Sequence, residues 1–158
     1  MRLLASGPLL KEAIRAAQLL MDKRGILAEV WSVTSYSELA RDGVAAQREL
    51  RLGQSERAPY VTSQLGASTA PVVAVSDYVR ALPDSIRAFV PSSCVTLGTD
   101  GFGRSDTRTR LRDFFEVDRR WIAYTAFGEL AAGREPAQRH AFGAELGLDL
   151  GKAWSAST

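Results

Sequence analysis

The chain has 158 residues, of which 46% are hydrophobic and 24% are charged, as in an ordinary globular protein of one domain. Twenty Lys and Arg residues against 18 Asp and Glu residues leave a net charge of only +2, which makes a nucleic acid a poor candidate for a partner. The single cysteine and single histidine exclude an internal disulfide and a zinc site of the usual ligand set, and they fit a cytoplasmic setting.

The opening residues predict a strand, a helix and a second strand. Residues 2–7 form a mostly apolar run that ends in a glycine, and apolar side chains recur at helical spacing from Lys11 to Arg24. Gly25 ends that helix, and residues 28–33 predict the next strand. No stretch reaches the roughly 18 apolar residues of a membrane span, and the opening does not resemble a secretory leader. We therefore expect no membrane partner.

A capped helix, a surface segment, a helical turn and a buried strand are predicted next. Ser35 followed by Glu38 forms a capping-box pattern for a short helix. Residues 41–58 are polar and charged, so we predict that they wrap the surface, and residues 60–65 predict a helical turn. Residues 71–75 are apolar and mostly β-branched without alternation, which is typical of a parallel strand covered on both faces.

The rest of the chain predicts one more strand, at residues 94–97, among helices at 84–89, 106–115, 118–132 and 136–146. Strands that alternate with helices at this spacing predict an α/β fold, a three-layer α/β/α sandwich. In such sheets ligands and partners meet the loops at the carboxyl ends of the strands. The loops that follow the predicted strands should therefore line one common edge.

The glycine-rich segment GTDGFGRSD after the last predicted strand is the strongest candidate for a site. Its glycines allow a tight turn whose N–H groups point one way, and two arginines stand near the start of the next helix. Such a turn suits a carboxylate or a phosphate, but Ser105 or Asp106 can instead cap the helix and occupy the same N–H groups. Two interpretations stay open, a small-anion site and a structural turn that contacts another domain. The residues concerned are Gly101, Gly103, Arg104, Ser105, Asp106 and Arg108.

The glycine spacing matches neither G-x-G-x-x-G nor a Walker loop, so nucleotide binding is not supported. We expect Gly103 to need a backbone conformation that a Cβ disfavours. The substitution Gly103→Ala should then lower the free energy of unfolding by about 1 kcal/mol or more.

Four other residues have both a chemical and a structural interpretation. Asp77 and Tyr78 follow a predicted strand and place an acid and a phenol at the sheet edge, although an Asp there more often caps the following helix. His140 lies among helical residues and is expected at the surface or in packing, and Cys94 is expected to be a small core residue. No nucleophile elbow, acid pair or Ser-His-Asp set is evident, so the chain does not resemble a complete enzyme.

Several stretches together resemble one enzyme family. The C-terminal part of the homodimeric, bacterial type of pyruvate dehydrogenase is similar, in the same order, to RLLASGPLLKEAIRAAQLL, AEVWSVTSYSELARDG, YVTSQL, APVVAVSDYVRALPDSIRAFVP and LGTDGFGRSDTRTRLRDFFEVD. Enzymes of that family are the decarboxylating component of the pyruvate dehydrogenase complex and depend on thiamine diphosphate. They belong to the transketolase superfamily. The resemblance runs from Arg2 to about Leu130, and LGTDGFGRSDTR is its most specific block.

The resemblance implies the fold of the transketolase C-terminal domain, with a mixed, mostly parallel five-stranded sheet and helices on both faces. It also implies a parent enzyme several times longer, of which we expect this chain to be a fragment. In that family two other domains hold thiamine diphosphate and magnesium, through a G-D-G…N motif and an activating glutamate. The chain contains no GDG and no asparagine, so no catalytic, cofactor-binding or metal-binding residue carries over, and we expect it to bind neither group.

The function that the resemblance implies for this chain is structural. The parent would decarboxylate pyruvate and reductively acetylate the lipoyl group of the acyltransferase partner, as a cytoplasmic homodimer. Residues 1–150 would form an assembly domain and residues 151–158 a flexible tail, and this fragment alone would be inactive. Its partners would be the other domains of the same enzyme, the second protomer and the acyltransferase. Two alternatives stay open: the same domain of a transketolase or another 2-oxo acid dehydrogenase, and a stand-alone regulatory module that binds a small anion.

Overall fold

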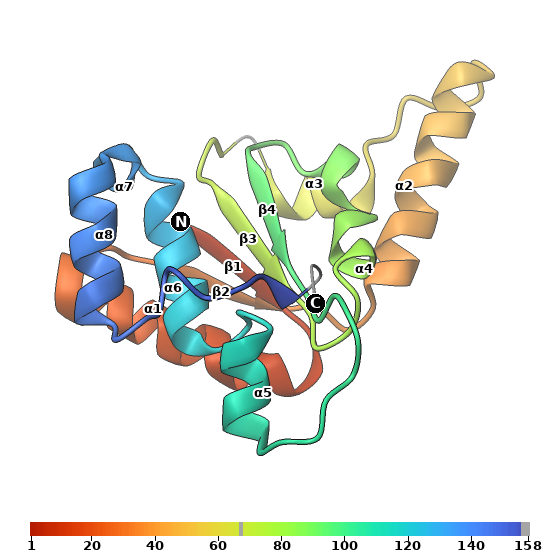
Figure 1. Cartoon of the computed structure of the whole chain (residues 1–158). Helices are drawn as coiled ribbons and strands as arrows, with labels where there is room; N and C mark the ends of the chain where they lie inside the picture. The colour runs from red at the N-terminus through yellow and green to blue at the C-terminus, as the bar shows by residue number, and fades with distance from the viewer. Residues whose placement is uncertain (67, 156–158) are drawn as a thin grey trace.

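A parallel sheet forms the centre of the molecule, which a computed structural model describes for residues 1–66 and 68–155 (Figure 1). Its strands occur in the spatial order β2-β1-β3-β4 and all run parallel. They are β1 (Arg2–Ala5), β2 (Glu29–Ser32), β3 (Val72–Val75) and β4 (Cys94–Leu97). Each strand predicted from the residues themselves is therefore confirmed.

The mixed, five-stranded sheet that the resemblance implied is wrong for the described residues, which form four strands, all of them parallel. A fifth strand would need another run of β-branched or aromatic residues, and after Leu97 the chain offers a glycine-rich loop and then segments with helical spacing.

Helices cover both faces of this sheet, because alternate side chains of each strand point to opposite sides (Figure 1). Leu3 and Val73 pack into a core with α1, α6 and α8, whereas Leu4 and Ala74 pack into a second core with α2 and α3. The predicted three-layer α/β/α sandwich is therefore confirmed. The helical segments are η1 (Gly7–Leu9), α1 (Leu10–Arg24), α2 (Tyr36–Arg51), α3 (Tyr60–Leu65), α4 (Ala81–Asp84), η2 (Arg87–Phe89), α5 (Arg108–Phe114), α6 (Arg119–Gly128), α7 (Ala131–Arg134) and α8 (Pro136–Glu145).

The largest departure from the sequence prediction is α2, which continues to Arg51 through residues that were predicted to wrap the surface. Its start is as predicted, since the Ser35 hydroxyl accepts a hydrogen bond from the backbone N–H of Glu38 (3.2 Å). The helix continues because it has an inward face: Gly43 is buried, and a Cβ added there would lie 2.4 Å from the Phe89 ring. The polar residues therefore lie on a helix whose far end projects from the body (Figure 1).

The segment that returns from α2 is held against it by one arginine. The Arg57 guanidinium contacts the carboxylates of Asp42 (2.7 Å) and Glu49 (2.9 Å), and the Asp42 carboxylate also accepts from the backbone N–H of Tyr60 (2.6 Å). These contacts join residues that are 8 to 18 positions apart, beyond the spacing of three or four residues that helical periodicity shows.

Tyr36 links α2 to the sheet, and replacing it should have a measurable cost. Its buried hydroxyl lies 3.1 Å from the carbonyl oxygen of Leu4 and 3.3 Å from that of Val75, and burial raises its pKa well above the ordinary value. We expect Tyr36→Phe to lower the free energy of unfolding by about 1 kcal/mol. Thermal unfolding should then show a Tm lower by roughly 2 to 4 °C. Tyr60→Phe, at a mostly exposed ring, is the matched control, and an equal shift in both variants would contradict this assignment.

Candidate functional site

The loops after β3 and β4 are tied together at the carboxyl edge of the sheet. The backbone N–H of Thr99 donates to the carbonyl oxygen of Tyr78 (2.9 Å). The Asp100 carboxylate accepts from the backbone N–H of Arg80 (2.8 Å) and pairs with its guanidinium (3.2 Å). Gly98 lies so close to the other loop that an added Cβ would be 2.5 Å from the Arg80 backbone. The two loops therefore line one edge of the sheet, as predicted.

The glycines of this loop differ in their conformational demands. Gly101 adopts a positive φ of 100°, which L side chains rarely adopt. Gly103 does not have a positive φ, and a Cβ added there would meet nothing within 4 Å. The expectation that Gly103 needs a backbone conformation that a Cβ disfavours is therefore wrong, and close approach requires a glycine at Gly98.

The cap of α5 is Thr107, so the prediction of a cap at Ser105 or Asp106 is wrong by one or two residues. The Thr107 hydroxyl accepts from the backbone N–H of Arg110 (3.4 Å). The Asp106 carboxylate accepts from the backbone N–H of Thr107 (2.7 Å), just before the helix. Ser105 and Asp106 are both exposed.

A cavity of about 440 Å³ lies between the glycine-rich loop, α5 and the turn after β1, and we call it the loop cavity. Four of the six predicted site residues line it, namely Gly101, Gly103, Arg104 and Arg108. The Arg104 guanidinium lies 4.3 Å from the centre of the Phe114 ring, a cation–π contact. Ser105 and Asp106 are not part of this lining, so the structure gathers the two arginines and two glycines and leaves the other two residues outside.

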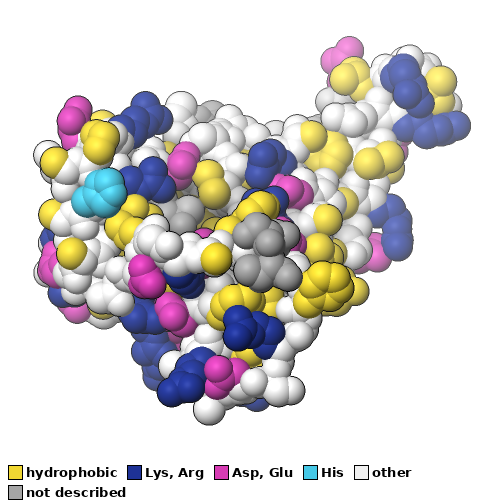
Figure 2. All heavy atoms as spheres, viewed as in Figure 1, with side chains coloured by type: hydrophobic (Ala, Val, Ile, Leu, Met, Phe, Trp, Pro, Cys, Tyr) yellow, Lys and Arg dark blue, Asp and Glu magenta, His cyan; other side chains and the backbone are white. Residues whose placement is uncertain are grey.

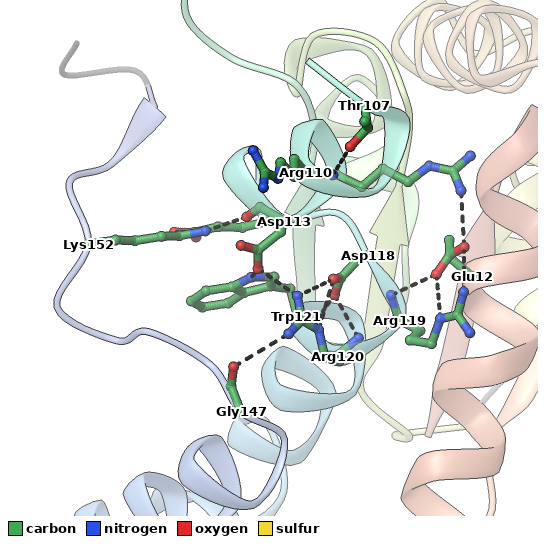
Figure 3. Close-up of polar contacts among 12 residues, drawn as sticks. Glu12, Thr107, Arg110, Asp113, Asp118, Arg119, Arg120, Trp121, Gly147 and Lys152 are labelled. Atoms are coloured by element: carbon green, nitrogen blue, oxygen red, sulfur yellow. Dashed lines mark hydrogen bonds and ion pairs between the residues drawn. The ribbon is translucent and has the colours of Figure 1, made fainter.

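Sequence reasoning missed Glu12, which joins three helices (Figure 3). Glu12 lies on the buried face of α1 and is only 4% exposed. Its carboxylate accepts from Arg112 of α5 (3.0 Å) and from both the guanidinium (2.9 Å) and the backbone N–H (3.1 Å) of Arg119, the first residue of α6. A carboxylate on the apolar stripe of a helix, between Leu9 and Ala16, was the signal that could have indicated a buried ion pair.

The surroundings of Glu12 favour its charged form. Burial on its own would raise the pKa of this carboxyl group, but hydrogen bonds from Arg119 and the charges of Arg119 and Arg112 outweigh it, so the pKa is lowered. The ionised Glu12 therefore stabilises the contact of α1 with α5 and α6.

A second polar cluster lies at the start of α6 (Figure 3). The Asp118 carboxylate caps the helix by accepting from the backbone N–H groups of Arg120 (2.8 Å) and Trp121 (3.1 Å). The Trp121 indole donates to the Asp113 carboxylate (3.0 Å). The Lys152 ammonium donates to the Asp113 carbonyl oxygen and lies 4.4 Å from the centre of the Trp121 ring. Lys152 of the predicted tail thus contacts the domain. Residues 156–158 lie outside the described residues, so the flexibility of the tail stays a prediction.

Three other candidates from the sequence lie at the surface. Asp77 is exposed beside the loop cavity, and the following helix has Arg80 at its cap position, so the prediction that Asp77 caps that helix is wrong. Tyr78 is exposed at the same edge. His140 is exposed on α8 with Nδ1 3.0 Å from the carbonyl oxygen of Pro136, which confirms the expected surface position.

Cys94 lies half-buried on β4, and its thiol should react slowly. Burial raises its pKa to about 11, an effect that the Arg87 guanidinium only partly offsets. Because the thiolate is the reactive form, we expect iodoacetamide at pH 8 to modify Cys94 at least about ten times more slowly than it modifies free glutathione. Mass spectrometry over a time course measures this rate, and unfolding the chain in urea should remove the difference. Equal rates in the folded chain and in glutathione would contradict the assignment.

The described residues offer no obvious place for a metal. Across residues 1–66 and 68–155 there is no group of three or more His, Cys, Asp or Glu side chains that could hold a metal ion. The chain has no asparagine to complete the family motif for magnesium and diphosphate, so the residues present do not fit that group. Within the same ranges no helix is long and apolar enough to cross a membrane.

Comparisons with known proteins place this arrangement in one family. Residues 1–118 match the family described as transketolase-like TK C-terminal domain. The chain is similar to the pyruvate dehydrogenase E1 components of Pseudomonas aeruginosa (50% identical over 133 residues), Mycolicibacterium smegmatis (46% over 136) and Escherichia coli K12 (43% over 133). The matches cover 82 to 85% of this chain but only 15% of each relative, so the chain spans about 15% of the length of the curated relatives it matches.

Proposed function

Since the chain belongs to the transketolase-like C-terminal domain family, we propose that it is the assembly domain of a pyruvate dehydrogenase E1 component. The observation that carries this proposal is the identity of 43 to 50% to E1 components over most of the chain. The parent would be an enzyme that decarboxylates pyruvate and acetylates the lipoyl group of an acyltransferase. Relatives named as pyruvate dehydrogenase E1 components favour this substrate over those of a transketolase.

The chemistry of the parent belongs, in this proposal, to its other domains. In such enzymes thiamine diphosphate and magnesium would supply the chemistry of decarboxylation, and the other domains would hold both groups. This chain contains neither the GDG nor the asparagine of the family motif for magnesium and diphosphate, so in this proposal we assign it no step of the reaction. The fragment alone is then inactive, and its contribution to turnover is to hold the active-site domains in place.

An apolar surface at the carboxyl edge supports the assembly role. Tyr78, Val79 and Phe102 expose 66, 40 and 83% of their surface, and we call these three residues the edge patch. Their loops are tied together through Thr99 and Asp100. Figure 2 shows hydrophobic side chains gathered on this side of the molecule. Exposed apolar groups of this kind mark surfaces that another domain or subunit covers.

The remaining parts of the proposal follow from the parent. The edge patch would contact the other domains of the same enzyme. That enzyme would be a homodimer. The acyltransferase component would be its partner in the complex, and the cytoplasm its location. The single cysteine is consistent with a reducing compartment.

A domain exchange tests the assembly role. The chain would replace the matching region of the Pseudomonas aeruginosa E1 component, with which it shares 50% identity. We expect the chimera to form the same oligomer as the natural enzyme and to decarboxylate pyruvate. Phe102→Glu in the chimera should weaken assembly, as measured by light scattering. Leu27→Glu, at a residue that is 78% exposed just before β2, is the matched control and should leave assembly intact.

The outcomes separate the candidate functions. A folded chimera without turnover would overturn the proposal. Titration of the 158-residue chain with thiamine diphosphate and magnesium should give no heat of binding, and saturable binding would mean that this domain holds the cofactor itself. A monomeric chain that binds inorganic phosphate tightly would favour the stand-alone regulatory module instead.

A further inference from the structure

We propose that a basic groove beside α5 binds an extended acidic segment of a partner protein. The groove has a volume of about 660 Å³ and lies between α1, α5 and the start of α6. Its cations are Lys11, Arg15, Arg108, Arg112, Arg119 and Arg120. This inference goes beyond the proposed function and does not depend on the identity of the parent, because it rests on charge and shape alone.

The groove holds more positive charge than the chain as a whole. Six cations face two carboxylates there, whereas the complete chain has a net charge of only +2. Both carboxylates are already compensated: Glu12 by Arg112 and Arg119, and Asp118 by Arg120 and the backbone of α6. Lys and Arg side chains are visible around α5 in Figure 2. The surplus of positive charge is therefore open to a negative partner.

Three cations supply that surplus. Lys11, Arg15 and Arg108 are exposed, and none of them forms an ion pair with another residue in the described part of the chain. Lys11 and Arg15 lie one turn apart on α1, so they present two charges along one side of the groove. Charges arranged in this way steer a partner of opposite sign and set its orientation.

The shape favours a chain segment over a small anion. The groove shares Pro8, Arg108 and Arg112 with the loop cavity, so the two hollows adjoin each other. The loop cavity adds an apolar wall from Leu111, Phe115 and Val117. An extended segment can place carboxylates along Lys11 and Arg15 and an apolar side chain against this wall. Phosphate or a dicarboxylate would use only part of this surface.

Fluorescence anisotropy with a synthetic peptide tests the inference. The probe is a labelled dodecapeptide that repeats Glu-Glu-Leu, titrated with the 158-residue chain, and the same peptide with Gln in place of Glu is the neutral control. We expect the acidic peptide to bind saturably and its affinity to fall as the salt concentration rises. The neutral peptide should bind with an affinity at least about ten-fold lower. The double variant Lys11→Glu, Arg15→Glu should reduce affinity about ten-fold or more.

A matched variant controls for the change in total charge. Arg48 and Arg51 are also exposed and unpaired within the described residues, but they lie on the projecting end of α2. The double variant Arg48→Glu, Arg51→Glu should therefore bind the acidic peptide within about two-fold of the natural chain, because it is outside the groove. Circular dichroism verifies that both double variants fold.

Each alternative outcome overturns the inference. Equal losses in the two double variants would mean that only net charge matters. Displacement of the peptide by inorganic phosphate at matched ionic strength would assign the groove to a small anion. Tighter binding of a single-stranded DNA oligonucleotide than of the peptide would assign it to a nucleic acid. Absence of peptide binding at low salt would leave the groove without this partner, and it would not affect the exchange experiment on the edge patch.

Discussion

Replacing Glu12 with glutamine should lower the free energy of unfolding by about 2 to 3 kcal/mol. Glutamine has a similar shape but no charge, so Arg112 and Arg119 lose the carboxylate that compensates them. Breaking a fully buried ion pair costs more than this, but the Arg119 side chain is 37% exposed and can turn toward water. Thermal unfolding should show a Tm lower by roughly 5 to 10 °C. A change of less than about 1 kcal/mol would mean that α1 is held by apolar packing alone.

Glu38→Gln is the matched control for this substitution. Glu38 forms an ion pair with Arg41 at 2.7 Å on the exposed side of α2, where solvent screens the charges. The free energy of unfolding should therefore change by no more than about 0.5 kcal/mol.

The stabilisation by Glu12 should depend on pH in a defined direction. The pKa of Glu12 is lower in the folded state than in the unfolded state. The contribution of Glu12 to the free energy of unfolding is therefore fully present above its pKa in the unfolded chain, and it is lost as pH falls through its pKa in the folded chain. The difference in stability between the natural chain and Glu12→Gln should thus be constant above about pH 5 and shrink below about pH 4. A difference that grows as pH falls would contradict the ionised state of Glu12.

Gly98→Ala should lower the free energy of unfolding by about 2 to 3 kcal/mol. The added Cβ would lie 2.5 Å from the backbone N and Cα of Arg80 and 2.8 Å from the carbonyl oxygen of Tyr78. Backbone atoms cannot move aside as a flexible side chain can, so the two loops must separate and weaken the contacts of Asp100 and Thr99. Urea unfolding measures the loss.

Gly103→Ala is the matched control within the same loop. A Cβ at Gly103 meets open space and the φ is not positive, so the free energy of unfolding should change by less than about 0.5 kcal/mol. If the control lost as much stability as Gly98→Ala, general disruption of the loop would explain both effects. In that case the close approach of Gly98 to Arg80 would not be the cause.

Local patterns predicted the fold well where neighbouring residues decide it. The run at Val72–Val75 indicated a strand buried on both faces, and the structure buries all four of its residues. The Ser35 cap was likewise visible in sequence. The extent of α2 was missed because its inward face depends on Phe89, and the charged residues after Arg41 outweighed the small buried ones in the local pattern. The residue patterns predicted the four strands that the structure has, whereas the family resemblance implied five.

The candidate site shows the same limit more sharply. Sequence spacing located the glycine-rich loop at the sheet edge, but it assigned the demanding glycine to position 103. Only the approach of a distant loop makes Gly98 constrained, and only the backbone conformation shows the demand at Gly101. The basic groove was also invisible, because Lys11 and Arg108 belong to helices far apart in the chain and the balanced charge near α5 suggested no surplus. An arginine or lysine can be compensated by carboxylates on other elements, and the periodicity of one helix does not show these.

The position of Glu12 also has a consequence for how the protein is made. Its arginine partners follow it by 100 and 107 residues. A ribosome adds about 5 to 20 residues per second, so the N-terminal helix waits roughly 5 to 20 seconds before both partners have been synthesised. During that time its carboxylate faces water instead of Arg112 and Arg119, and the apolar stripe around it lacks the cover of α6. The ion pairs of Glu12 with α5 and α6 can therefore form only after Arg119 has left the ribosome.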